Sequence, residues 1–147
     1  MSNLEDASMD SDPSVRLQAT LAAGLAASPQ DLEVLLERCR VEPDFQVREM
    51  LTWALLRLPH ELVVQRLVEE LKRPEAQARS QALHTLSKSG AAQAWKAVAA
   101  RLDDEDSSVV RTSWYAAVAL VPDDRRNWLA GRLAERLGQG DHETNLV

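Results

Sequence analysis

A two-residue motif recurs along this chain at almost constant spacing, and it constrains the fold more than any other feature. Its four copies are Val15-Arg16, Val47-Arg48, Ala78-Arg79 and Val110-Arg111, at steps of 32, 31 and 32 residues. After each copy, apolar residues follow at offsets of four, seven and eight, which is the spacing of one face of an α-helix. A fixed period of this length is typical of stacked structural repeats.

A second apolar stripe keeps the same period between the motif copies. It comprises Leu32, Leu35, Leu36 and Cys39, then Val64, Leu67, Val68 and Leu71, then Trp95, Val98, Ala99 and Leu102, and finally Leu129, Ala130 and Leu133. Each repeat therefore holds two helices. We predict helices at 13–26, 29–41, 45–58, 60–72, 76–87, 91–102, 107–120 and 124–137, with a frayed helix near 3–9.

The composition supports an all-α fold. Only 5 glycines and 6 prolines occur among 147 residues, and 45% of the residues are hydrophobic, mostly Ala and Leu, which favour helices. No apolar run is long enough to span a membrane, and residues 1–13 lack the features of a secretory signal. The single cysteine excludes an internal disulfide and suits a reducing compartment, so a cytoplasmic protein is expected.

Acidic residues accompany the recurring arginines. Asp12, Asp44 and Glu75 each stand four residues before an arginine, and Asp106 stands five before Arg111. An acid at this place can cap the amino end of a helix, and four residues is also a favourable spacing for an ion pair. We therefore expect a structural ladder along one edge of the array, formed by Asp12, Arg16, Asp44, Arg48, Glu75, Arg79, Asp106 and Arg111.

These residues resemble the HEAT repeat, whose second helix typically begins Asp-Pro-x-Val-Arg-x-x-Ala. Residues 12–19 match that pattern throughout, residues 44–48 keep the Asp and the Val-Arg, and the third and fourth copies are weaker. The short period is similar to that of the HEAT-like repeats of bilin lyases. The resemblance implies a right-handed α-solenoid of about four repeats, built from stacked antiparallel helix pairs whose second helices line a concave surface. We divide the chain into an acidic amino-terminal tail or frayed helix (1–11), the repeat array (12–138) and an incomplete further repeat or tail (139–147).

A catalytic constellation is missing from the sequence. His60, His84 and His142 are not spaced as metal ligands, and the glycines form no phosphate-binding fingerprint. Cys39 completes an apolar stripe, which indicates a buried and unreactive thiol rather than a nucleophile. The acidic run 103–106 is interpreted as a solvated linker rather than a cation site. We therefore expect no enzyme activity, no metal and no cofactor.

Binding is better supported, because the second helices carry apolar side chains on the face opposite their core stripe. That face should be solvated, yet it includes leucines and Trp53, as a protein-binding groove would. Trp53 could instead belong to the core by folding over a neighbouring helix. The predicted partner-binding residues are Leu17, Leu21, Glu49, Trp53, Leu56, Ser80, His84, Thr112, Tyr115 and Ala116.

The function expected from these features is a non-catalytic scaffold that binds a protein or peptide along the concave face. Two alternatives stay open: an accessory subunit of a lyase that handles a pigment or cofactor, and a HEAT-like nucleic-acid-binding protein. The net charge of −6 disfavours binding to a phosphate backbone. The carboxyl-terminal end, with Leu133 and Leu137, is expected to be partly uncovered and could support self-association.

Overall fold

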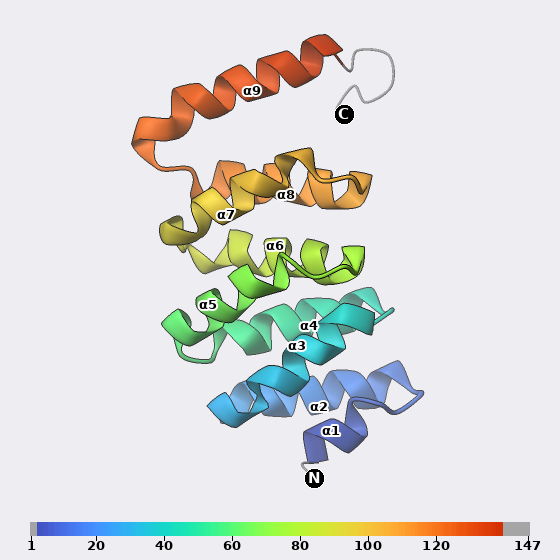
Figure 1. Ribbon diagram of the computed structural model, residues 1–147. Helices are drawn as coiled ribbons and strands as arrows, with labels where there is room; N and C mark the ends of the chain where they lie inside the picture. Colours follow the sequence, from blue (N-terminus) through green and yellow to red (C-terminus); the bar gives the residue numbers. More distant parts are fainter. Residues whose placement is uncertain (1–2, 140–147) are drawn as a thin grey trace.

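The chain folds as a single stack of helices, described by a computed structural model over residues 3–139 (Figure 1). The helices in this range are α1 (Asn3–Ala7), α2 (Pro13–Ala26), α3 (Leu32–Val41), α4 (Phe45–Leu56), α5 (His60–Glu70), α6 (Ala76–Ser89), α7 (Trp95–Ala99), α8 (Ser107–Leu120) and α9 (Arg126–Gln139). Short 3-10 turns begin α3, α7 and α9, and another follows α7. No strand occurs in this range, and the predicted all-α solenoid is confirmed.

The even-numbered helices α2, α4, α6 and α8 carry the recurring motif and begin at acidic residues. Asp12 accepts a hydrogen bond from the Ser14 amide at 2.9 Å, and Asp44 accepts one from the Val47 amide at 3.0 Å. Asp106 accepts from the amides of Ser108 and Val109. These side chains satisfy amide groups that a helix leaves unpaired at its first turn, so the sequence sets where three of the four helices begin.

The apolar stripes of both helix sets meet in one continuous core along the stack. Leu35 and Leu36 of α3, Leu51 and Leu55 of α4, and Leu67 of α5 are each at most 1% exposed. The core stripe of α2 is less covered, since Val15 is 38% exposed and Ala22 is also exposed. The reason is that only the five-residue helix α1 precedes α2 in the described range, whereas α4 has both α2 and α3 packed against it.

Successive even-numbered helices lie against one another, with the closest packing between α2 and α4 and between α6 and α8. In the described range, no odd-numbered helix packs comparably against another odd-numbered helix. The surface of the even-numbered helices that faces away from the odd-numbered helices is called the even-helix face below.

Among the described residues, only those on one side of α9 pack against it. Leu129 is 6% exposed, whereas Leu133 and Leu137, further along α9, are 39% and 46% exposed. In earlier repeats the residues equivalent to Leu133 are buried, namely Cys39, Leu71 and Leu102. Most of the proposed final segment 139–147 lies outside the described residues. None of the described helices has the length and apolar content needed to cross a membrane.

Candidate partner-binding surface

The even-helix face is built from residues four positions apart, which form one stripe per helix. The ninth residue of each helix forms a column that runs along the stack: Leu21, Trp53, His84 and Tyr115. Trp53 is 37% exposed and Tyr115 is 72% exposed, while Leu21 and His84 are half-buried. The predicted residues Leu17, Glu49, Leu56, Ser80 and Thr112 are also half-buried.

Trp53 is held in place by the preceding repeat. Its ring lies so close to Gly24 that a Cβ atom added there would clash with a ring carbon. Arg57 bridges the same two residues, because its guanidinium lies 5.6 Å from the Trp53 ring and its Nε donates to the Gly24 carbonyl at 3.1 Å. Trp53 therefore combines the two predicted roles, since one part of the ring packs on α2 while another part faces solvent.

Polar side chains connect the middle of this face. Nε2 of His84 in α6 lies 2.8 Å from a carboxylate oxygen of Glu49 in α4. The hydroxyls of Ser80 and Thr112 are 2.9 Å apart and join α6 to α8. These contacts fix the relative position of the three helices, so the face is a preformed surface.

In the fourth repeat the prediction was shifted by one residue. Asp106 caps α8, so this helix begins 31 residues after α6 begins. The motif arginine of α8, Arg111, comes 32 residues after Arg79 and therefore lies one position later in its helix. Val110, which is 6% exposed, therefore occupies the place that Arg79 holds in α6, and Arg111 is exposed. Ala116 was predicted to face a partner but is fully buried. Val118 is at offset eight from Val110 and was therefore predicted for the core stripe, but it is 62% exposed on the even-helix face.

Sequence reasoning also missed Phe45. This residue begins α4, is 65% exposed, and lies on the same stripe as Glu49 and Trp53. Its ring lies 5.9 Å from the Arg48 guanidinium. The spacing of 45, 49, 53 was the signal that could have found it. Three of the chain's six aromatic residues thus lie exposed on this face: Phe45, Trp53 and Tyr115.

The predicted pairing of each arginine with the acid four residues earlier is wrong. Arg16 binds Glu42, not Asp12, with Nε and Nη2 each 2.9 Å from a carboxylate oxygen. Arg79 binds Asp104, not Glu75, with both distances 3.0 Å. The acids four residues earlier have other tasks: Asp12 and Asp44 cap helices, and Glu75 pairs with Arg73 at 2.9 Å.

Glu42 and Asp104 were missed although they share a signal, because each stands two residues before the acid that begins the next even-numbered helix. Burial alone would raise the pKa of Glu42, but hydrogen bonds from Arg16, the Asp44 amide and Arg38 outweigh burial and lower that pKa. The pKa of Asp104 is lowered in the same way, against burial, by Arg79 and the Asp106 amide. Both carboxylates are therefore charged links between successive repeats.

Arg48 occupies the equivalent position in the second repeat but has no such acid, because Arg73 stands two residues before Glu75. Within residues 3–139, Arg48 donates to main-chain carbonyls and to no carboxylate, at 3.1 Å to Glu42 and 2.7 Å to Pro43. We call the three contacts between successive even-numbered helices the first (α2–α4), second (α4–α6) and third (α6–α8) joints. The second joint contains buried hydroxyls instead: Thr52 and Thr85 are 2.9 Å apart, and Gln81 donates to Thr52 at 2.9 Å.

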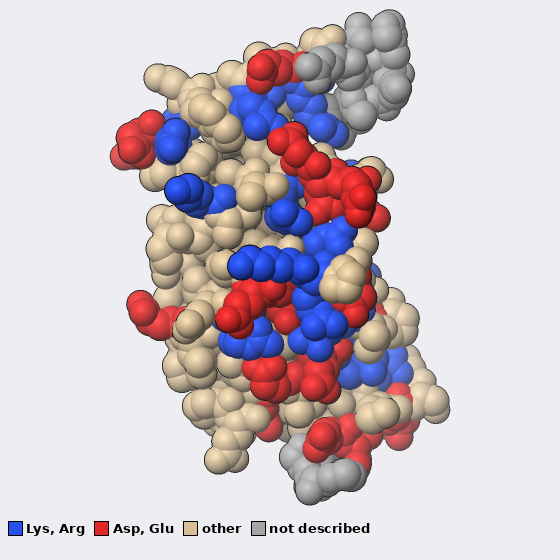
Figure 2. All heavy atoms as spheres, viewed as in Figure 1, with Lys and Arg blue, Asp and Glu red and all other residues tan. Residues whose placement is uncertain are grey.

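Ion pairs also connect the odd-numbered helices. Arg66 of α5 binds Glu33 of α3 through two hydrogen bonds of 2.7 and 2.8 Å, and Arg40 of α3 binds Glu70 at the end of α5. Figure 2 shows acidic and basic side chains interleaved in a band along the stack. Opposite charges are thus matched on this side of the molecule.

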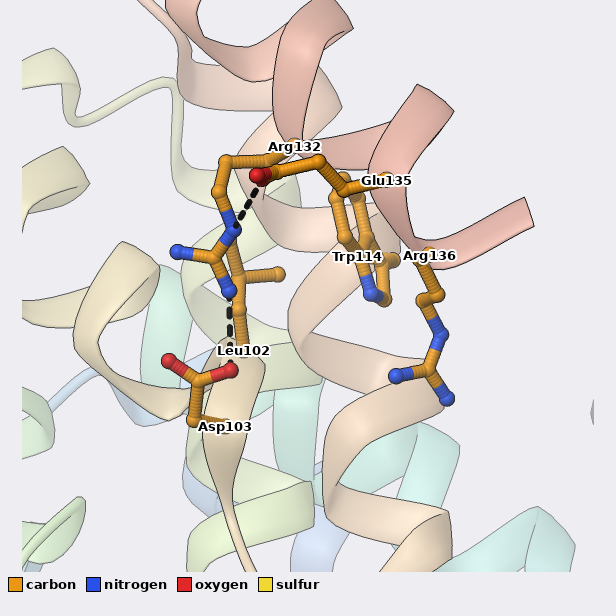
Figure 3. A pocket seen from close by; sticks show the side chains of 6 residues that line it. All are labelled: Leu102, Asp103, Trp114, Arg132, Glu135 and Arg136. Carbon is orange, nitrogen blue, oxygen red and sulfur yellow. Dashed lines mark hydrogen bonds and ion pairs between the residues drawn. The ribbon is translucent and has the colours of Figure 1, made fainter. Parts of the chain in front are cut away.

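A cavity of about 250 Å³ lies between α9 and the preceding repeat (Figure 3). Arg132 crosses it, 2.8 Å from Asp103 and 3.8 Å from Glu135. Nε1 of Trp114 and Nε of Arg136 also line this region, and both are buried without a hydrogen-bond partner in the part of the chain described. Unpaired buried donors weaken packing, which agrees with the loose cover of α9.

The remaining candidate groups show no reactive arrangement. Cys39 is buried, and burial raises the pKa of its thiol to about 12, as expected for the unreactive thiol predicted from its stripe. Within residues 3–139, no group of three or more His, Cys, Asp or Glu side chains is placed to hold a metal ion. The acid run 103–106 is divided among a helix cap, a link to Arg79 and surface ion pairs.

Comparison with known proteins agrees with this architecture. A crystal structure of an engineered protein from the Northeast Structural Genomics Consortium has a TM-score of 0.51 and 19% sequence identity to this chain, and the match covers 99% of this chain and 76% of the engineered one. That likeness concerns the fold alone. No match was found among curated proteins. Residues 32–119 match the family model for HEAT repeats, and since they are more than half of the chain, the chain belongs to the HEAT-repeat family.

Proposed function

We propose that this protein is a non-catalytic adaptor that binds a segment of another protein across its even-helix face. HEAT repeats generally mediate protein–protein interaction. The observation that carries the proposal is the column of ninth residues, in which Trp53 and Tyr115 stay exposed on the same face as Phe45. Exposed apolar side chains that gather on one face are typical of protein interaction sites. Tyr and Trp are among the residues that contribute most of the binding energy in protein interfaces.

The polar contacts of this face support the same function. Trp53 is fixed by Gly24 and Arg57, and His84 lies against Glu49. A side chain that is already ordered loses little conformational entropy when a partner binds. A rigid surface of this kind favours recognition of an extended or helical segment that crosses several repeats.

The test begins with a peptide ligand for the full chain, selected from a displayed library of random 16-residue sequences. Its affinity is then measured by fluorescence anisotropy for the wild-type protein and for Trp53→Ala and Tyr115→Ala variants. We expect each substitution to weaken binding by about 2 kcal/mol, roughly 30-fold. Leu62→Ala is the control, because Leu62 is 40% exposed on α5, outside this face.

Circular dichroism and thermal melting show whether each variant folds. Tyr115 is 72% exposed, so its removal should leave the melting temperature unchanged. If the selected peptides bind the Trp53→Ala/Tyr115→Ala double variant as tightly as they bind the wild type, the proposed surface is wrong.

A further inference from the structure

The distribution of charge differs sharply between the two sets of helices. Of the 23 acidic residues in the chain, only Glu49 lies within the even-numbered helices. The same helices contain five basic residues: Arg16, Arg48, Arg79, Lys88 and Arg111. A chain with a net charge of −6 therefore has one layer that is net positive.

Part of that positive charge is already neutralised. Arg16 and Arg79 are buried and paired with Glu42 and Asp104. Glu49, the one acid of these helices, lies against His84. Arg48 is half-buried and donates to main-chain carbonyls, so the exposed cationic charge of the even-helix face is on Lys88, Arg111 and Arg57, the residue that follows α4.

These three cations have no acidic partner among the residues that the structure describes. Arg57 donates to a main-chain carbonyl, and neither Lys88 nor Arg111 forms an ion pair there. Arg57 and Lys88 share the thirteenth position from the start of their repeats' even-numbered helices, and Arg111 shares the fifth position with Glu49. Both positions flank the column that holds Trp53 and Tyr115.

From this arrangement we propose that the partner segment is acidic, with an apolar side chain that packs on Trp53 and carboxylates that lie against Arg57, Lys88 and Arg111. This inference rests on the proposed function. The rest of the molecule has an excess of acids, which repel an acidic segment from the other surfaces. Such a segment is therefore attracted to the even-helix face.

A nucleic acid is the other polyanion to consider, and the observations favour a protein. Three exposed cations give few phosphate contacts, and the chain as a whole is negative. The face also includes Leu17, Leu21 and Leu56, aliphatic side chains that suit an apolar peptide residue better than a phosphate backbone.

The experiment uses the selected 16-residue peptides, sorted by whether Trp53→Ala weakens their binding. Among those that depend on Trp53, we expect net negative sequences with at least one large apolar residue. Affinity of such a peptide should fall at least tenfold for Lys88→Glu/Arg111→Glu, and also when NaCl is raised from 50 to 500 mM. Lys72→Glu/Lys96→Glu is the matched control, since it changes the net charge equally at exposed positions outside the face.

Each result has a separate meaning. Trp53-dependent peptides that are neutral or basic, or that tolerate the Lys88→Glu/Arg111→Glu change, overturn the acidic partner while the proposed function stands. Peptides that never depend on Trp53 or Tyr115 overturn the proposed function itself. A 20-base-pair DNA duplex that competes more strongly than the acidic peptides would show a general polyanion site and would also overturn the proposal.

Discussion

The third joint and the second joint connect equivalent helices by different means. In the third joint, Arg79 forms two hydrogen bonds with the buried carboxylate of Asp104, and α6 and α8 pack closely. In the second joint, no described acid pairs with Arg48, and α4 and α6 are less closely packed. There Thr52, Thr85 and Gln81 form hydrogen bonds inside the core. Arg73 stands where the first and third joints have Glu42 and Asp104. This one residue therefore changes how two successive repeats are held together.

The largest expected effect is the loss of Arg79. Its removal in Arg79→Ala leaves Asp104 buried without its main partner, which should lower the free energy of unfolding by about 3 kcal/mol. Arg48→Ala leaves no buried charge behind and should cost at most about 1 kcal/mol. Urea denaturation of both variants measures the gap, and equal losses would show that the two joints do not differ in the way described.

Low pH should remove much of the stability that the joints with a buried carboxylate have over the second joint. The pKa values of Glu42 and Asp104 are below their ordinary values near 4.5 and 3.8, so the unfolded chain binds protons more readily than the folded one. Their contribution to stability is complete above those ordinary values and is lost as the pH falls through the lowered pKa values. The loss should be smaller than that of Arg79→Ala, because a protonated carboxyl can still accept a hydrogen bond. Chemical denaturation from pH 7 to pH 3, with Asp104→Asn as the reference, measures this slope, and parallel curves for the two proteins would contradict the prediction.

The hydroxyl contact in the second joint is expected to have a moderate effect. Thr85→Val keeps the shape of the side chain but removes the hydroxyl that lies 2.9 Å from Thr52, which should cost about 1 kcal/mol. Ser113→Val is not an equivalent control, because valine adds volume at a fully buried site. Thr112→Val, at a half-buried hydroxyl of the third joint, serves better and should change stability less, as thermal melting can show.

The smallest expected effect tests whether the second joint can be given an arginine–carboxylate pair like those of the first and third joints. The double variant Arg73→Glu/Glu75→Gln places an acid two residues before the N-cap residue of α6, where Glu42 and Asp104 stand in the neighbouring repeats. It also removes repulsion between Arg73 and Arg40. We expect a slight rise in the melting temperature that disappears when Arg48→Ala is added, and a rise that persists in the triple variant would assign the gain to relief of repulsion alone.

The periodicity was enough to predict the fold, because both apolar stripes recur in every repeat and each copy supports the assignment of the others. The boundaries of α2 and α8 were predicted to the residue, since proline or an acidic cap marks where they begin. Side-chain partners were harder to predict. Distances along one helix suggested that Asp12 pairs with Arg16, but the carboxylate of Glu42, 26 residues away, is brought closer by the stacking of repeats.

The candidate surface was predicted in part for a related reason. Counting from the Val-Arg motif placed Leu21, Trp53 and His84 in one column, where the structure also has them. In the fourth repeat the motif lies one residue later than the helix start, so Ala116 was taken for a surface residue and Val118 for a core residue. Counting from the capping acid, Asp106, would have avoided both errors. The partner-binding role of this surface stays a prediction.

The environment of Cys39 has a practical consequence for measuring these joints. A thiol that is 5% exposed and has a pKa near 12 is almost entirely protonated at neutral pH, so maleimide dyes should leave it unlabelled. Two cysteines introduced at exposed sites such as Gln30 and Gln93 would therefore be the sole reactive positions in the folded chain. Fluorescence energy transfer between dyes at these sites would report bending of the stack without any need to engineer the native cysteine away.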